Sequence, residues 1–445
     1  MITFLTGVTV GLAMGAAAFT ITREYLVPRR LLQLFSAIPK TMRFDLATAQ
    51  SMRNMVVLAE PSLAAVFTER HAERMLKELR TRLPDRKADK APLWRRHTSA
   101  HPSVAYFPTS PPPTGTTLPA ECSPLDAVLI SWPWHYTSRW THHANWARAI
   151  AAANARVIIL SDDQQDQAEL REYLNVAGLP LDRIEILEAP VEDVWIRDYG
   201  PTFVRKPDGG AALIANPYVP AEHPYRKGDN SVSFVLGASL GLPVFRLPLQ
   251  IEGGNLVSDG HGLMITSTAT LDRNPELSRD DVAAIFAQYF GCNRTEFIPA
   301  LPAEVTGHAD MVVRFVDATT AVIASAPAGH RWAGYLDTVA TQISNLKNAH
   351  GAPYAVHRLP IAVSSRYASA FWSYVNCIQV NGTTIVPVFG EATDSVALAF
   401  FRSLDMGPVV GIDFSDFLVG SVHCQSKEIF RGALSKAGPL PGALA

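Results

Sequence analysis

Beyond about residue 125 the sequence alternates short apolar runs with amphipathic segments, and this alternation is the feature that most limits the fold. Runs such as 127–132 and 156–160 have the length and composition of buried strands. Segments such as 140–153 and 279–290 have helical periodicity. Helices that follow strands along a whole domain indicate the α/β class. Further strands are expected at 183–187, 311–315, 320–324 and 384–388, and further helices at 231–240, 331–350 and 395–403.

The N-terminal segment, residues 1–30, has the composition of a membrane anchor with a basic flank. No charged residue occurs from Ile2 to Thr22, a length that crosses a bilayer when helical. Its glycines repeat at the GxxxG spacing, and the arginines that follow favour a cytoplasmic, membrane-associated location for the rest of the chain. An apolar helix packed on the protein, or a start site placed too early, explains the segment equally well. A secreted or periplasmic location stays open.

Two further parts separate this segment from the α/β region. Residues 31–85 are predicted to be helical, because the apolar residues of 62–83 recur at helical spacing. Residues 86–121 are basic and rich in proline, a composition typical of a linker. The main domain is therefore expected at 122–435, and no role is assigned to the N-terminal parts.

Charge and motif content exclude several classes of protein. Residues 1–98 carry 16 Lys and Arg against 8 Asp and Glu, so that, of totals of 39 and 41, the rest of the chain carries 23 against 33. An acidic domain suits a small cationic substrate better than nucleic acid, although a solvated acidic surface has the same composition. The four cysteines lack the CxxC and CxxH spacing of zinc sites. No dinucleotide or phosphate-binding glycine motif occurs, so no cofactor is expected.

The segment Val419–Lys427 (VGSVHCQSK) contains Cys424, which we predict to be a nucleophile. It follows an apolar run and begins with a glycine-led turn. A thiol in such a turn, beside a histidine and a serine, is expected to be partly exposed and kept as thiolate by neighbouring donors. A buried cysteine that acts only as a small apolar side chain is the alternative interpretation.

Three polar islands lie upstream of this segment. In 192–201 (EDVWIRDYGP) we expect Asp198 near a strand end, directed into a pocket to hold a cation; a buried Asp–Arg pair or a turn cap is the alternative. In 251–260 (IEGGNLVSDG) the paired glycines indicate close backbone approach near a ligand, and Asp259-Gly260 indicates a hairpin turn.

The third island precedes an apolar run and contains His308 and Asp310. In an extended chain the two side chains point the same way, so Asp310 would fix the tautomer of a general acid and base, His308. A histidine buried in the core with its hydrogen bonds satisfied is the alternative. Two ligands without a third nearby argue against a metal site.

These residue types together suit a guanidinium group, which is planar, cationic and rich in N–H donors. Asp198 and Asp310 could hold it through paired hydrogen bonds and turn its central carbon towards Cys424. Cys424 would attack that carbon, and His308 would protonate the departing ammonia. A water activated by His308 would then release a ureido product.

Six short motifs occur in a fixed order between about Leu125 and Ile429. They are Ile130–Pro133 (ISWP), Trp195–Pro201 (WIRDYGP), Glu252–Asn255 (EGGN), Gly307–Asp310 (GHAD), Ser373–Asn376 (SYVN) and Gly420–Cys424 (GSVHC). Their order resembles that of the agmatine deiminase and bacterial-type peptidylarginine deiminase family. The resemblance implies the pentein fold, an α/β propeller of five ββαβ units around a central active site, and guanidine hydrolysis without a cofactor or metal.

The resemblance also assigns roles to motif residues. It implies that Cys424 is the nucleophile, His308 the acid and base, and Asp198 and Asp310 the guanidinium ligands. Further residues expected at the substrate are Trp132, Trp195, Gly254 and Asn255. The chain departs from the family pattern at Val419 and Ser421, where a glycine and an asparagine are usual.

The substrate is expected to be a small guanidino compound or an arginyl peptide. Residues 216–230 look more like the peptidylarginine type, and Arg226 could pair with a carboxylate that agmatine lacks; a solvent-facing basic turn is the alternative. The product would be N-carbamoylputrescine, on the route to putrescine, or citrulline. An inactive binding protein at a membrane and an amidinotransferase of the same fold are the alternative functions. The oligomeric state is left open.

Overall fold

The computed structural model describes residues 110–132, 140–161, 164–218, 228–304, 306–364, 370–417 and 419–434. The predicted membrane segment, the predicted helix at 62–83, most of the predicted linker, and Arg226 lie outside these ranges. Among the described residues, no helix combines the length and the hydropathy needed to cross a bilayer.

Four of the five sheets formed by the described residues share one topology: two antiparallel strands, a crossover helix, and a third strand parallel to the second. In chain order these units are β4 (Thr202–Arg205), β5 (Ala211–Ala215), α10 (Val232–Leu240) and β6 (Val244–Arg246); β7 (Val257–Ser258), β8 (Leu263–Ser267), α12 (Arg279–Phe290) and β9 (Arg294–Ile298); β10 (Val313–Phe315), β11 (Thr320–Ser325), α13 (Ala333–Ser344) and β12 (Ala355–Pro360); and β13 (Ile378–Val380), β14 (Thr383–Val388), α14 (Thr393–Ser403) and β15 (Val409–Asp413).

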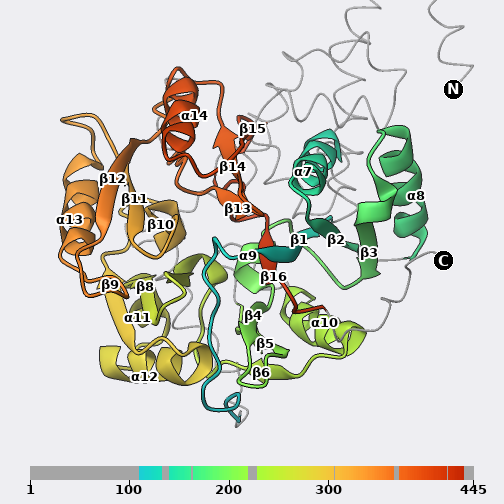
Figure 1. Cartoon of the computed structure of the whole chain (residues 1–445), viewed down its shortest axis with the longest axis horizontal. Helices are drawn as coiled ribbons and strands as arrows, with labels where there is room; N and C mark the ends of the chain where they lie inside the picture. The colour runs from blue at the N-terminus through green and yellow to red at the C-terminus, as the bar shows by residue number, and fades with distance from the viewer. Residues whose placement is uncertain are drawn as a thin grey trace, which may run out of the picture. The chain divides into compact units, whose positions relative to one another are not determined.

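The fifth sheet joins the two ends of the described chain. Its outer strand, β16 (Lys427–Phe430), pairs antiparallel with β1 (Leu125–Ser131). The helix α7 (Trp140–Ala152) then connects β1 to the parallel strand β2 (Arg156–Ser161), which completes a fifth ββαβ unit. A fourth strand, β3 (Ile184–Glu188), follows through α8 (Gln164–Val176). The five sheets follow one another around a common centre (Figure 1), and the predicted set of five ββαβ units is confirmed.

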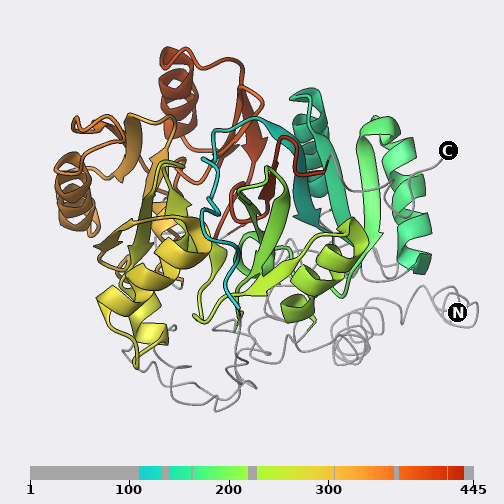
Figure 2. The ribbon, with the colours of Figure 1, turned by 60° about the horizontal axis from the view of Figure 1, so that its bottom comes forward.

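The central strands are buried because helices and neighbouring sheets cover both faces. Every residue of β5 and β8 is buried, as expected of central strands in a sheet that is covered on both faces. On the outside, α12 packs Phe286 and Phe290 into a cluster that includes Met264 of β8. Figure 2 shows the helices on the outer side of the sheets.

Local sequence signals set several element boundaries. The helix α12 begins at a capping box formed by Ser278 and Asp281, and it ends at Gly291 with a positive φ of 68°. The turn predicted at Asp259-Gly260 is confirmed, because the Asp259 carboxylate accepts hydrogen bonds from the backbone N–H groups of His261 and Leu263 between β7 and β8.

Two predicted elements are shorter than expected. The helix predicted at 331–350 ends at Ser344, because the side chain of Asn348 accepts hydrogen bonds from the N–H groups of His350 and Ala352 and closes a turn instead. The strand predicted at 311–315 starts only at Val313. Its first residue, Met311, ends a 3₁₀ turn, η8 (Ala309–Met311).

Candidate active site

The residues of the candidate site occupy equivalent places in the five units. Each lies just before the first strand of its unit: Asp198 before β4, Glu252 before β7, His308 and Asp310 before β10, Asn376 before β13, and Cys424 before β16. Three of these connections are short helical turns, α9 (Ile196–Tyr199), η7 (Gly253–Asn255) and η8, and they contact one another in series. The repeated topology therefore brings positions more than 200 residues apart to one place.

His308 is held between two carboxylates. Its Nε2 atom lies 2.6 Å from Oε2 of Glu252, and its Nδ1 atom lies 3.7 Å from Oδ1 of Asp198. Glu252 is in turn paired with Arg273 at 2.6 Å. The face of the imidazole rests on Gly254, where an added Cβ would lie 2.4 Å from Nδ1. The predicted close backbone approach at the paired glycines is thus present.

The prediction that Asp310 fixes the tautomer of His308 is wrong. The chain is extended at His308 but turns at η8, so the two side chains do not share a strand face. The 3₁₀ turn is held by Asn255, whose side-chain oxygen accepts a hydrogen bond from the backbone N–H of Ala309. The partner of the imidazole is Glu252, which was not predicted as a site residue.

The charges of His308, Asp198 and Glu252 set one another's pKa values. Burial opposes a charged His308, but the Asp198 and Glu252 carboxylates outweigh it and raise the pKa of His308 to about 9. Burial raises the pKa of Asp198 to about 6, against the attraction of His308. In Glu252, Arg273 and His308 overcome burial and lower the pKa to about 2. At neutral pH His308 therefore carries a proton that it can donate.

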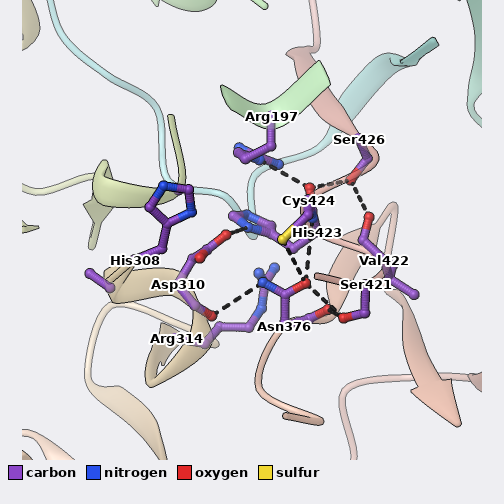
Figure 3. Close-up of polar contacts among 12 residues, drawn as sticks. Arg197, His308, Asp310, Arg314, Asn376, Ser421, Val422, His423, Cys424 and Ser426 are labelled. Atoms are coloured by element: carbon purple, nitrogen blue, oxygen red, sulfur yellow. Dashed lines mark hydrogen bonds and ion pairs between the residues drawn. The ribbon is translucent and has the colours of Figure 1, made fainter. Parts of the chain in front are cut away.

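Asp310 belongs to a second chain of contacts. Its Oδ2 atom lies 2.6 Å from Nδ1 of His423, and Nε2 of His423 lies 3.1 Å from Oε1 of Glu121. Within the described part of the chain its other oxygen, Oδ1, is buried and has no hydrogen-bond partner. Figure 3 shows the carboxylate directed at His423. One oxygen of Asp310 is thus anchored and the other is available to a donor.

Cys424 is buried, with 4% of its surface exposed, so the predicted partial exposure is wrong. Its Sγ atom lies 3.4 Å from the side-chain oxygen of Asn376 (Figure 3). Burial, followed by the carboxylates of Asp310 and Asp198, raises the pKa of the thiol well above its ordinary value. The predicted resting thiolate is therefore wrong as well, because two nearby negative charges and a dry environment favour the protonated thiol.

Asn376 connects the turn that contains Cys424 to the fourth unit. Its side-chain oxygen accepts a hydrogen bond of 2.7 Å from the hydroxyl of Ser421, and its backbone oxygen accepts one from the N–H of His423 at 3.2 Å. Ser421, one of the departures from the family pattern, is thus used to hold this turn. Asn376 appeared in the SYVN motif but was not predicted as a site residue.

A cluster of charged residues lies behind Cys424. Arg197 donates to Glu428 at 2.7 Å, and Arg314 donates to Glu121 at 3.2 Å. In the described part of the chain, Glu121, His423 and Glu428 are the one group that brings three potential metal ligands together. The two guanidinium groups already neutralise its carboxylates, so ion pairing accounts for the cluster. A cavity of about 40 Å³ adjoins it, lined in part by Glu121, Arg197, Lys427 and Glu428.

The two predicted substrate tryptophans, Trp195 and Trp132, lie in different surroundings. Trp195 is half-buried beside Gly420, where an added Cβ would lie 2.7 Å from the indole and 3.2 Å from Cβ of Cys424. Trp132 is buried in an aromatic group with Trp140 and Tyr173.

Comparison with known proteins identifies a family whose sequence profile covers the candidate site. The sequence profile of the Porphyromonas-type peptidyl-arginine deiminase family matches residues 117–429, which include the candidate site from Glu121 to Glu428. The chain belongs to this family. Members of the agmatine deiminase and peptidyl-arginine deiminase family are hydrolases that act on the C–N bonds of amidines.

Individual relatives of this deiminase family are distant in sequence but similar over their whole length. The agmatine deiminase of Stutzerimonas stutzeri is 25% identical over 365 residues, which cover 72% of this chain and 97% of that protein. Among solved structures, the agmatine deiminase of Enterococcus faecalis has a TM-score of 0.62 at 21% identity, over 71% of this chain and 96% of the other. The C. jejuni agmatine deiminase with substrate bound has a TM-score of 0.62 at 18% identity, over 71% and 97%. The predicted pentein fold is confirmed.

Proposed function

We propose that this protein is a guanidino-group hydrolase that uses Cys424 as its nucleophile. The observation that carries the proposal is the convergence of two buried carboxylates, Asp198 and Asp310, on one buried thiol. Such an arrangement is unfavourable when empty, because the negative charges lack a full complement of partners. A cationic ligand would relieve it.

A guanidinium group matches this demand in shape as well as charge. It presents N–H donors in a plane, and Oδ1 of Asp310 is a buried acceptor without a partner among the described residues. Asp198 would hold the opposite edge of the group. The bound cation would also offset the two charges that raise the pKa of Cys424, so the thiolate would form only when substrate is present.

The reaction would then proceed in two steps. The Cys424 thiolate attacks the central guanidinium carbon, and His308 gives its proton to the departing nitrogen, which leaves as ammonia. His308, now neutral, takes a proton from water as the water attacks the covalent adduct, and the thiolate is released. The net change consumes the guanidinium and one water and yields a ureido product and ammonium.

Two substrates fit the comparisons. Agmatine, which would give N-carbamoylputrescine, is favoured by relatives whose names are agmatine deiminase. Arginine in a peptide, which would give citrulline, is favoured by the family profile. Both carry the same guanidinium group, so the roles proposed for Cys424, His308, Asp198 and Asp310 do not depend on the choice.

The test is to incubate the purified protein with agmatine, free arginine and an arginyl peptide blocked at both ends. Ammonia and the matching ureido compound should form from at least one of them. Cys424→Ala should abolish the reaction, whereas Cys292→Ala should retain it, because Cys292 is a buried cysteine near the β7–β8 hairpin. Absence of ammonia from all three compounds would contradict the proposal, and transfer of the amidino group to an added amine would indicate an amidinotransferase instead.

A further inference from the structure

Within this proposed function, the geometry points to a positioning role for two residues outside the reacting set, His423 and Glu121. We infer that they fix the guanidinium ligand Asp310, holding one carboxylate oxygen so that the other faces the substrate. The role rests on a continuous line of contacts, from Oδ2 of Asp310 to Nδ1 of His423 at 2.6 Å, and from Nε2 of His423 to Oε1 of Glu121 at 3.1 Å.

The backbone on both sides of His423 is fixed, so its ring has a defined position. Its N–H donates to the backbone oxygen of Asn376 at 3.2 Å, and its carbonyl accepts from Nε of Arg197 at 3.2 Å. The next residue is the nucleophile, Cys424. One turn of the chain therefore carries both the thiol and the group that orients the carboxylate opposite it, which fixes their relative geometry.

Glu121 is anchored independently of His423. Its carboxylate pairs with Arg314 at 3.2 Å and lies 3.8 Å from Arg197. Residues 117 and 118, just before it, bond to the backbone of Arg205 and Phe290, so the approach of this segment is also fixed. Glu121 thus offers His423 a rigid acceptor rather than a mobile one.

A doubly protonated His423 accounts for the two short contacts, since each ring nitrogen faces a carboxylate oxygen and only an imidazolium can donate to both. The charged groups that face it from the surrounding elements are Asp310, Glu121, Glu428 and Arg197. Arg314 pairs with Glu121. Burial and Arg197 lower the pKa of His423, but Glu121 and Asp310 outweigh them and raise it.

Replacement of the carboxylate by an amide separates charge from shape. In Glu121→Gln a neutral His423 can still donate from Nδ1 to Asp310 and accept at Nε2 from the new amide. The imidazolium, however, loses one of its two carboxylate partners, so it should lose its proton at lower pH than in the wild type. The hydrogen bond to Asp310 is then kept at every pH, and protonation at low pH should restore the positive charge of His423 beside Asp310.

The experiment measures two quantities in the full-length wild type and in Glu121→Gln. The first is the pH at which His423 titrates, followed by NMR of isotope-labelled histidine, with the resonance assigned by its loss in His423→Asn. The second is kcat/KM against pH for the guanidino compound that the wild type turns over. Glu185→Gln is the matched control, because it removes a carboxylate on β3 that is paired with Arg156 on β2.

We expect the His423 midpoint in Glu121→Gln to fall by a unit of pH or more. The alkaline limb of the kcat/KM profile should shift to lower pH with it, while kcat/KM at pH 6 stays close to that of the wild type. At pH 8 the kcat/KM of the variant should be about tenfold lower than that of the wild type. This loss corresponds to the free-energy contribution of one charge-assisted hydrogen bond. Glu185→Gln should change neither quantity. A merely structural role for Glu121 would instead lower kcat/KM equally at every pH.

Two results would overturn the inference. An unchanged His423 midpoint in Glu121→Gln would show that the two groups are not coupled, even if the wild type turns over none of the compounds tested. A lowered midpoint with an unmoved alkaline limb would show that the charge of His423 does not act through Asp310. Failure of the wild type with every guanidino compound contradicts the proposed function separately, since the NMR titration needs no turnover.

Discussion

The Nε2 atom of His308 lies 2.6 Å from Oε2 of Glu252, and this contact decides the state in which the imidazole meets a substrate. Glu252 is kept ionised by Arg273, so it acts as a fixed negative charge. With Asp198 on the other side, it keeps His308 protonated at neutral pH. A protonated imidazole is the form required of a group that first donates a proton to departing ammonia.

Glu252→Gln should lower the pKa of His308 and shift the alkaline limb of kcat/KM to lower pH. The raised pKa means that the acid form is present up to about pH 9 in the wild type and is lost above it. Without the Glu252 charge this loss should begin nearer neutrality. The pH dependence of kcat/KM measures the shift, with Glu188→Gln at the exposed end of β3 as the control. An alkaline limb at the wild-type pH would show that Glu252 does not set the charge of His308.

Gly254→Ala should abolish most activity while the protein remains folded. The added Cβ would lie 2.4 Å from Nδ1 of His308, and the imidazole is held on its other edge by Glu252, so it must move away from Asp198. A loss of about 100-fold in kcat is expected from a displaced acid group. Activity assays and thermal unfolding measure the two effects.

Gly334→Ala provides the comparison for this change, because nothing lies within 4 Å of a Cβ at Gly334, near the start of α13. It should be neutral or stabilise the helix by up to about 1 kcal/mol. Wild-type kcat in Gly254→Ala would mean that the contact between the glycine and the imidazole does not position His308.

Several helices and strands could be predicted because their signals are local, whereas their grouping into five ββαβ units was implied by the family resemblance. The helix at 279–290 was predicted with the observed bounds, and its capping residue Ser278 and its final glycine are part of the same short segment. The strands β2 and β11 were likewise predicted to within one residue of their observed ends, since a continuous apolar run carries the pattern of a buried strand.

The errors in the site arose from contacts between distant segments. The turn at Asp310 depends on the contact between Ala309 and Asn255, 54 positions earlier, and no local pattern around Asp310 reveals that contact. Burial of Cys424 similarly depends on Asn376 and on the N–H of Arg197, which donates to the Cys424 carbonyl at 3.1 Å. A glycine-led turn predicts exposure only when nothing from another unit covers it.

The thiol of Cys424 should be unreactive in the free protein at neutral pH. Its raised pKa means that thiolate accumulates only under alkaline conditions, so alkylation by iodoacetamide should be slow at pH 7 and keep rising to pH 10. Asp198→Asn should accelerate alkylation, because it removes one of the carboxylates that disfavour the thiolate. Mass spectrometry of the peptide containing Cys424 follows the reaction.

The other cysteines make this experiment selective. Burial raises the pKa of Cys292 to about 12 and that of Cys377 to about 11, so both should stay unmodified while the protein is folded. Cys122 is only half-buried and should be replaced by serine in the background used. A rate for Cys424 that reaches a plateau near pH 7 would contradict the prediction, since it would reveal a resting thiolate.

Lys427→Met should stabilise the protein more at pH 7 than at pH 10. Burial and the nearby charge of Arg197 lower the pKa of Lys427 from its ordinary value to about 7, and its ammonium group donates to the backbone oxygen of Arg197 at 3.1 Å. Between pH 7 and pH 10 the unfolded chain therefore binds more protons at this position than the native protein does. This group makes wild-type stability rise with pH over that window, and methionine removes the effect.

The difference in unfolding free energy between variant and wild type isolates this contribution. His308 acts in the opposite sense, because its raised pKa favours the folded state at low pH, but it is common to both proteins and cancels. Urea unfolding at pH 7 and pH 10 should give differences that change by several kcal/mol, at about 1.4 kcal/mol per pKa unit. Lys206→Met, on an exposed turn beside Asp208, controls for loss of a lysine side chain. Equal differences at the two pH values would mean that Lys427 keeps its proton when buried, with Glu428 and Asp198 compensating its charge.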